Sequence, residues 1–151
     1  MAIREIRVEG DEILTKHCKE VKVFDKKLHT LLDDMYETMK KAGGVGLAAP
    51  QVGVLKRAVV IDVGEGLIEL VNPQIIDEQG TQEGSEGCLS VPGVYGIVER
   101  PNVVTVRAQD RDGKWFKITG RELTARAMCH EVEHLEGILF REHVTEYCEA
   151  E

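Results

Sequence analysis

The clearest periodic pattern of the chain lies in its first third. Apolar residues recur there at helical spacing, at Leu28, Leu31, Leu32, Met35 and Met39. Residues three and four apart share one face of a helix, so this pattern predicts an amphipathic α-helix. Asp25 stands at the expected N-cap, and the Gly43-Gly44 pair is a stop signal.

The middle of the chain follows a different pattern. Short β-branched runs occupy residues 57–63, 67–73 and 103–109, and the turn signal DRDG (110–113) joins the last run to 114–119. Runs of this length and composition are typical of strands, and such a turn joins antiparallel neighbours. We therefore expect antiparallel sheet structure here.

A second helix is expected between Glu122 and Gly137. The stretch is rich in good helix formers, and Gly137 suits a helix end because glycine tolerates a positive φ. One side of this helix carries Leu123, Ala127, His130, Glu131 and His134, and a second, apolar stripe carries Met128, Val132 and Leu135. A helix that is apolar over most of its circumference lies inside a domain, so the histidines should face a buried site.

The length and the net charge of the chain limit the number of domains and the kinds of binding partner that we expect. The 151 residues fit one compact domain, and we expect a single domain over 1–151. The net charge of −8 argues against a surface for nucleic acid or anionic lipid, because both need clustered lysines and arginines. No apolar run suggests a signal peptide or a membrane span. The sequence thus favours a cytoplasmic protein that binds neither nucleic acid nor membrane.

The spacing of the four cysteines along the chain does not suggest disulfides. Cys18, Cys88, Cys129 and Cys148 form no CxxC pair and lack the dense spacing of a disulfide-rich domain. We therefore expect reduced thiols, any of which could act as a metal ligand or a nucleophile.

The segment HEVEH (130–134) carries the chemistry of the second helix. His130 and His134 stand one turn apart, which lets two imidazoles bind one metal ion. Glu131 would then lie close enough to handle the protons of a water at that metal. A HExxH string also arises by chance, in about a couple of per cent of chains like this one. The alternative is therefore two ordinary, hydrogen-bonded helix histidines.

A third ligand must come from elsewhere, since catalytic zinc sites usually have three protein ligands. His143 is one candidate, although Phe140 occupies the position where the metzincin pattern needs a histidine. Cys88 is the better candidate, because the Gly-rich segment 84–93, expected to be a loop entering a strand, would let a thiolate approach a metal. Read alone, Cys88 could equally be a buried structural thiol.

The segment GVGLAAPQVG (44–53) directly follows the first helix. Its small residues would leave a bare backbone edge beside the site, and Gln51 offers a neutral amide that can polarise a carbonyl oxygen. The alternative is a plain connector from helix to strand, with Gln51 in solvent.

Three segments together indicate a family. GVGLAAPQ (44–51), EGCLS (86–90) and HEVEH (130–134) resemble, in order and separation, the signature motifs of the peptide deformylases. AIREI, VVIDV, LVNP, ERP and GILF resemble the same family, so the likeness covers most of the chain. It agrees with the α+β fold that the order of elements predicts, with antiparallel sheets around a central HExxH helix and the first helix outside.

The resemblance implies a metal-dependent hydrolase that removes the formyl group from the formyl-methionine of nascent polypeptides and releases formate. Cys88, His130 and His134 would bind the metal, and Glu131 would transfer the proton. Gln51 and the backbone N–H of Leu89 would stabilise the oxyanion. The residues expected to contact the substrate are Gly44, Val45, Gly46, Glu86 and Gly87.

The resemblance also implies a cofactor and partners. We expect one divalent ion, Fe(II) physiologically, with Zn(II), Ni(II) or Co(II) as substitutes. An iron–thiolate site predicts sensitivity to air. The partners would be N-formylmethionyl peptides and nascent chains, with transient proximity to the ribosome.

The chain departs from the family pattern at two positions of the third motif. Glu133 stands where the family usually has aspartate, and Cys129 stands where glutamine often precedes the first histidine. We expect Glu133 to pair with Arg100 and so orient the helix. The segment after Phe140 is short and acidic, whereas several bacterial members carry a longer C-terminal helix associated with ribosome docking.

Two other functions stay open from the residues alone. A zinc peptidase or amidase could use the same helix on other acyl groups, and it would need a roomier acyl pocket. A deformylase-like protein could instead bind metal or nascent chains without turnover. Its usual mark would be the loss of Glu131, Gln51 or Cys88, and all three are present.

Overall fold

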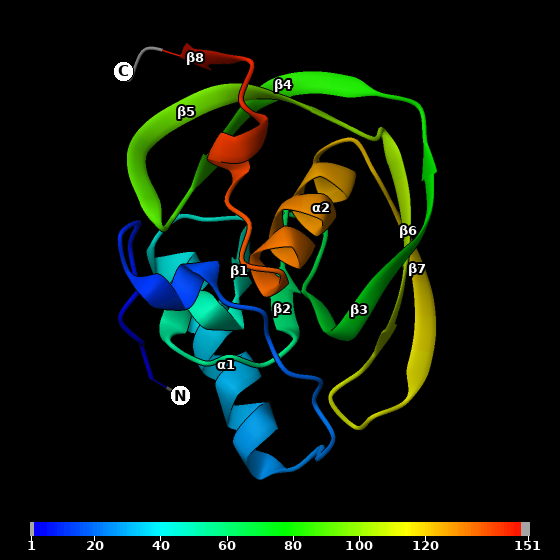
Figure 1. The fold of residues 1–151 in the computed structure, drawn as a ribbon. Helices are drawn as coiled ribbons and strands as arrows, with labels where there is room; N and C mark the ends of the chain where they lie inside the picture. The colour runs from blue at the N-terminus through cyan, green and yellow to red at the C-terminus, as the bar shows by residue number, and fades with distance from the viewer. Residues whose placement is uncertain (1, 149–151) are drawn as a thin grey trace.

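The structure is a computed structural model that describes residues 2–148, with two α-helices, three 3₁₀ helices and eight strands in that range (Figure 1). The helices are α1 (Lys26–Lys41), α2 (Leu123–Leu135), η1 (Glu12–Thr15), η2 (Ala49–Val52) and η3 (Phe140–His143). The strands are β1 (Gly46–Ala48), β2 (Ala58–Ile61), β3 (Ile68–Gln79), β4 (Gln82–Cys88), β5 (Val91–Arg100), β6 (Val103–Gln109), β7 (Trp115–Arg121) and β8 (Glu146–Cys148).

The strands form two antiparallel sheets around a central helix. One sheet has the order β1-β2-β3-β6-β7, and the other has the order β4-β5-β8. Helix α2 lies between the sheets and contacts strands of both, while α1 lies outside (Figure 1). The predicted α+β fold with a central HExxH helix is confirmed.

Strand β2 shows how the two helices share the five-stranded sheet. Ala58 and Val60 pack into the cluster that contains α1, whereas Val59 and Ile61 pack into the cluster that contains α2. Successive side chains of a strand point to opposite faces, so the helices cover opposite faces of this sheet. This explains why the run AVVI is apolar at every position and fully buried.

Helix α1 follows the sequence pattern closely. The Asp25 side chain caps it by accepting a hydrogen bond from the Leu28 N–H at 3.1 Å. The chain leaves the helix through Gly43, whose φ of +73° lies in the left-handed region. All five apolar positions of the predicted stripe are buried.

The segment 84–93 is not a loop, in contrast to our expectation. Its first half belongs to β4, which pairs with β5 along its whole length. Glycine is uncommon in strands, so the composition hides this one. The glycines serve close packing: a Cβ on Gly84 would lie 3.1 Å from the Arg126 guanidinium, and a Cβ on Gly87 would lie 2.6 Å from the Tyr95 ring.

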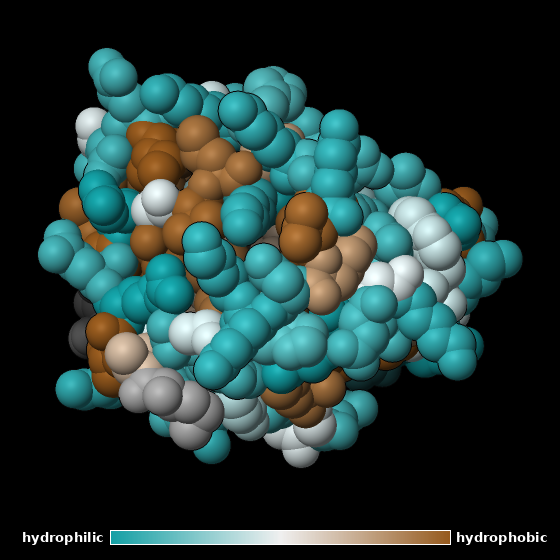
Figure 2. Space-filling model, turned by 90° about the horizontal axis from the view of Figure 1, so that it is seen from below, coloured by the Kyte–Doolittle hydropathy of each residue, from teal (hydrophilic) through white to brown (hydrophobic). Residues whose placement is uncertain are grey.

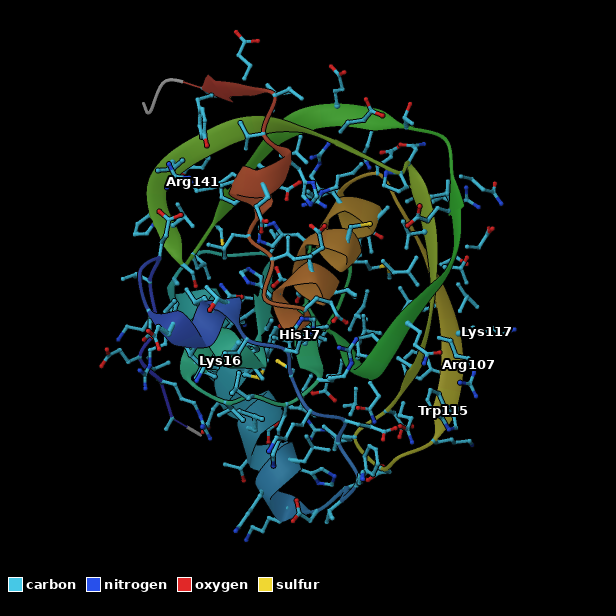
Figure 3. The ribbon with its side chains drawn as sticks, viewed as in Figure 1. Lys16, His17, Arg107, Trp115, Lys117 and Arg141 are labelled. Carbon is cyan, nitrogen blue, oxygen red and sulfur yellow. The ribbon has the colours of Figure 1, made fainter. Side chains whose placement is uncertain are left out.

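The face of the molecule seen in Figure 2 is mainly polar. Figure 2 shows one face on which hydrophilic residues predominate and hydrophobic residues gather in separate clusters. On the outer side of β6 and β7, the Arg107 guanidinium stacks 3.7 Å from the centre of the Trp115 ring, with Lys117 on the neighbouring strand (Figure 3). Among residues 2–148, no helix is long and apolar enough to cross a membrane.

Candidate metal centre

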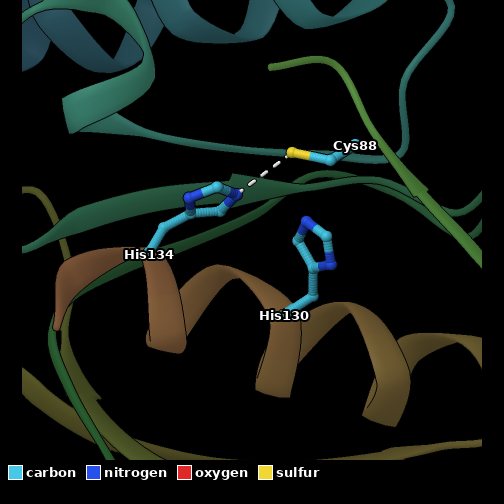
Figure 4. A group of neighbouring side chains, drawn as sticks. All are labelled: Cys88, His130 and His134. Carbon is cyan, nitrogen blue, oxygen red and sulfur yellow. Dashed lines mark hydrogen bonds between the residues drawn. The ribbon is translucent and has the colours of Figure 1, made fainter. Parts of the chain in front are cut away.

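The side chains of Cys88, His130 and His134 meet between β4 and α2 (Figure 4). One ligand atom from each lies within 4.8 Å of the other two, and the Cys88 Sγ is 3.3 Å from the His134 Nε2. Both histidines are buried on α2, one helical turn apart. One thiolate and two imidazoles at these separations are a donor set that divalent zinc, iron, nickel or cobalt accepts, so the residues fit such an ion.

The alternative third ligand lies elsewhere. His143, in η3, places its Nε2 at 2.6 Å from a carboxylate oxygen of Glu133, and it does not join the cluster of ligand atoms. Glu133 also accepts a 2.6 Å hydrogen bond from Arg100, which is the pairing expected from the sequence.

A buried carboxylate orients His130. The His130 Nδ1 lies 2.6 Å from the Glu86 Oε1, which leaves its Nε2 for the metal site. Burial opposes an ionised Glu86, but hydrogen bonds with His130 and Arg100 hold its pKa well below the usual range. We expected Glu86 to contact the substrate. Its carboxylate instead bonds within the protein, so only its backbone remains for a peptide.

Glu131 is buried beside the histidines. Its Oε1 has no hydrogen-bond partner among the described residues, and burial raises the pKa of Glu131 to about 7. Strand β1 passes directly over it, because a Cβ on Gly46 would lie 2.5 Å from the Glu131 Oε2. A carboxyl group with a pKa near neutrality can both accept and return a proton at physiological pH.

The electrostatics of the site favour a cation. Burial disfavours a charged His130, yet Glu131, Cys88 and Glu86 together raise its pKa to about 10. Burial and the neighbouring His130 lower the pKa of His134, so the two rings are not both positively charged. The negative groups around the rings thus stabilise one positive charge, which a metal ion can supply in place of the proton.

Gln51 points into the site and not into solvent. Its Oε1 accepts a hydrogen bond from the Ala48 N–H at 2.9 Å, and its Nε2 donates to the Ser90 Oγ at 3.0 Å. The same Nε2 approaches the Cys88 Sγ at 3.6 Å. These contacts fix an amide N–H beside the ligand cluster. Gln51 is buried, so the alternative in which it lies in solvent is wrong.

A cavity of about 420 Å³ opens beside these groups. It is lined by the expected catalytic residues Gln51, Leu89 and Glu131 and by the five residues expected to contact the substrate, but not by His134. Leu89 follows β4 and covers Gly44, where a Cβ would lie 2.6 Å from the leucine side chain. Val45, Tyr95 and Leu123 line the cavity with partly exposed apolar side chains. β1 and β4 are outer strands of their sheets, and outer strands offer backbone groups for pairing.

The sequence did not point to two residues of the site. Ser90 accepts a hydrogen bond from Gln51, and Arg126 donates to Glu86 at 2.8 Å. A helical arginine is usually a surface residue, so Arg126 attracted no attention. Its position one turn before His130 was the available signal.

Comparisons with known proteins agree with this geometry. The family model described as polypeptide deformylase matches residues 3–150. The chain is 59% identical over 144 residues to the peptide deformylase of Alkaliphilus metalliredigens, covering 95% of this chain and 98% of the relative. It is 58% identical over 147 residues to that of Acetivibrio thermocellus, covering 97% and 86%.

Solved structures show the same likeness. The crystal structure of peptide deformylase from Thermotoga maritima matches with a TM-score of 0.92 at 38% identity, covering 95% of this chain and 98% of that one. A peptide deformylase structure from Legionella pneumophila matches with a TM-score of 0.91 at 49% identity, covering 95% and 86%. The resemblance of the three motifs is thus confirmed, and the chain belongs to the polypeptide deformylase family.

Proposed function

We propose that the cavity between β1, β4 and α2 is the site of deformylation, with Cys88, His130 and His134 holding the metal ion. As a deformylase, the protein is a metal-dependent hydrolase that removes the N-formyl group from nascent polypeptides. The observation that most supports this site is the meeting of one sulfur and two imidazole nitrogens within 4.8 Å, beside a buried carboxyl group whose pKa is about 7.

The proposed chemistry divides between the ion and the protein. A divalent ion bound here supplies Lewis acidity, which makes water a nucleophile near neutral pH. Glu131 accepts a proton as the water oxygen attacks the formyl carbon. It then returns that proton to the amine nitrogen as the C–N bond breaks, and formate leaves. One carboxylate thus serves both proton transfers.

Gln51 and Leu89 would stabilise the charge that develops on the formyl oxygen. The Gln51 Nε2 is held beside Cys88 by its bond to Ser90, and the Leu89 N–H follows Cys88 in the chain. Donors fixed before the reaction need no reorganisation as the charge develops, which is why they lower the barrier.

The substrate peptide would pair with the backbone of Gly44, Val45 and Gly46 as an added strand, with Glu86 and Gly87 on the opposite wall. Backbone pairing is independent of side-chain sequence, which suits an enzyme that acts on many nascent chains. The apolar residues around the cavity suit the methionine side chain of an N-formylmethionyl peptide.

We also propose the finer assignments that the family leaves open. The donor set accepts Fe(II), Zn(II), Ni(II) and Co(II), and we take Fe(II) as the physiological ion. The whole chain would be one catalytic domain, working in the cytoplasm near ribosomes, where formylated nascent chains emerge. Loss of activity on exposure to air, with recovery after Fe(II) reloading, would support iron.

The test is anaerobic formate release from formyl-Met-Ala-Ser by metal-loaded protein, with metal content assayed for each variant. Wild type should release formate rapidly, and Glu131→Ala should keep its metal but lose activity by at least about 10²-fold. Glu65→Ala, at an exposed glutamate, is the matched control. Release of acetate from acetyl-Met-Ala-Ser at the same rate would favour a broader amidase. No formate from loaded wild type would contradict the proposed site.

A further inference from the structure

We infer that Arg126 is a positioning residue of the metal centre, because it fixes the separation between the helix that carries His130 and His134 and the strand that carries Cys88. This inference rests on the proposed ligand set. Arg126 lines the cavity but contacts neither the ligand cluster nor the proposed reacting atoms.

The Glu86 carboxylate has four hydrogen bonds inside the protein. Oε1 accepts from the His130 Nδ1 at 2.6 Å and from the Arg100 Nη2 at 2.7 Å. Oε2 accepts from the Arg100 Nε at 3.1 Å and from the Arg126 Nη1 at 2.8 Å. Both oxygens are thus saturated, and the His130 ring can turn only if this carboxylate moves.

Arg126 joins three elements at this point. It lies on α2 one turn before His130, so the two side chains reach the same carboxylate of β4 from one helix face. Its Nη1 also donates to the backbone oxygen of Val98 on β5 at 3.0 Å. Arg126 therefore ties α2 to both long strands of the three-stranded sheet, and Cys88 ends one of these strands.

Arg100 does not duplicate this role. It extends from β5, and its two bonds to Glu86 join neighbouring strands of one sheet. Its contact with α2 is made through Glu133, at the opposite end of the metal-binding turn. The helix is thus held to the sheet on both sides of His130, and Arg126 holds the N-terminal side.

The neighbouring residues pack closely around Arg126. The residue is buried, and Gly84 of β4 lies against its guanidinium, where a Cβ would come within 3.1 Å of the Nη2. The two arginines balance the charges of Glu86 and Glu133. A side chain without charge at position 126 would leave the cluster with an excess negative charge and Glu86 with an unused acceptor.

The experiment uses the full chain loaded with Co²⁺, whose absorption spectrum reports coordination geometry and the cobalt–thiolate bond. The variants are Arg126→Met, Arg126→Lys and Gly84→Ala. Arg107→Met is the control, since Arg107 stacks on Trp115 on the outer side of β6 and β7 (Figure 3). The measurements are the rate of cobalt release to excess chelator, the spectrum, and kcat and KM for a formyl peptide.

Arg126→Met should release cobalt up to about 10-fold faster than wild type, because direct hydrogen-bond partners of metal ligands contribute about 10- to 100-fold in affinity and Arg126 acts one contact further out, through Glu86. Its cobalt spectrum should shift, and kcat should fall more than KM changes. Arg126→Lys keeps the charge and should recover part of the loss. In Gly84→Ala, the added Cβ would press on the guanidinium, so cobalt release should be faster than in wild type but slower than in Arg126→Met. Arg107→Met should release cobalt at the wild-type rate.

An unchanged release rate and spectrum in Arg126→Met would overturn the inference, even if the variant unfolds at lower urea. If that variant does not fold, unchanged release in both Arg126→Lys and Gly84→Ala would overturn it instead. Failure of the ligand assignment itself is distinct: wild type would then bind no stoichiometric cobalt with a thiolate charge-transfer band.

Discussion

Both polar atoms of the Gln51 side chain have hydrogen-bond partners. The amide oxygen accepts from Ala48, and the amide nitrogen donates to Ser90 beside the Cys88 sulfur. Gln51→Met would keep the volume and remove the donor, so kcat should fall by about 10²–10³-fold while KM changes little. Steady-state formate release checks this prediction. Ser90→Ala, which removes only the partner, is the control and should cost less; equal losses would assign the effect to packing.

Cys129 stands next to a metal ligand and faces away from the site. It is buried in the cluster between α2 and the five-stranded sheet, and burial raises its pKa to about 11. About one thiol in a thousand is then ionised at pH 8, and the thiolate is the reactive form. Iodoacetamide at pH 8 should therefore modify Cys148, on the edge strand β8, long before Cys129, as peptide mass mapping would show. Rapid modification of Cys129 in folded protein would contradict this placement.

At the scale of elements, the end of α2 depends on Gly137. Its φ is +77°, and a Cβ would lie 2.4 Å from the Thr15 carbonyl oxygen. Gly43 ends α1 with a similar φ of +73° but has open space around it. Gly43→Ala should cost about 1–2 kcal/mol from backbone conformation alone. Gly137→Ala should cost about 1–3 kcal/mol more, because the backbone there must also shift.

Urea unfolding of the two glycine variants beside wild type measures the difference. The difference between the two variants isolates the steric contact, because the positive φ costs alanine nearly the same free energy at both positions. Equal destabilisation of the two variants would mean that the chain around Thr15 moves freely. Because His134 lies three residues before Gly137, a displaced helix end should also weaken metal binding in Gly137→Ala alone.

The elements differ in how well the sequence predicts them, for physical reasons. Helix α1 has an uninterrupted apolar stripe and a capping aspartate, and β6 matches its predicted range of 103–109. Strand β4 was missed because its glycines lower strand propensity, and the reason for them lies in Arg126 and Tyr95, far away in sequence. β3 continues to Gln79, beyond the predicted 73, because β6 pairs with its polar half.

The residues of the candidate site also differ in how well the sequence predicts them. The HExxH spacing predicted that His130, Glu131 and His134 would lie together on α2, whereas the assignment of Cys88 as the third ligand rested on the family resemblance. The expected pairing of Glu133 with Arg100 is present, but no local pattern encodes it, because the two residues lie 33 positions apart on α2 and β5. The inward turn of Glu86 and the role of Ser90 depend on how two strands and a helix meet, which no local pattern encodes.

At the scale of the whole molecule, the metal would join the two halves of the core. Cys88 belongs to the three-stranded sheet, and the histidines belong to α2, which packs on the five-stranded sheet. Removing the ion should leave the Cys88 thiol and two buried imidazoles without a shared partner. At a free-ion concentration about 100-fold above Kd, binding stabilises a fold by about 2.7 kcal/mol. For this size, that corresponds to about 5–11 °C in Tm.

Thermal unfolding before and after chelation, with readdition of Zn²⁺ or Co²⁺, checks this prediction. Recovery of the Tm on readdition excludes chemical damage by the chelator. A double substitution, His130→Ala with His134→Ala, should make the Tm insensitive to chelator. An unchanged Tm in wild type would mean that the ion does not join these elements.

The distance along the chain between the proposed ligands has a consequence for folding order. Cys88 and His134 are 46 residues apart, and between them lie β5, the antiparallel pair of β6 and β7, and most of α2. Contacts so far apart in sequence require closure of a long loop, which makes them late and slow to form. During refolding, the cobalt–thiolate absorption band would therefore appear after the circular-dichroism signals of helices and strands. Its time of appearance would report when the two sheets enclose α2.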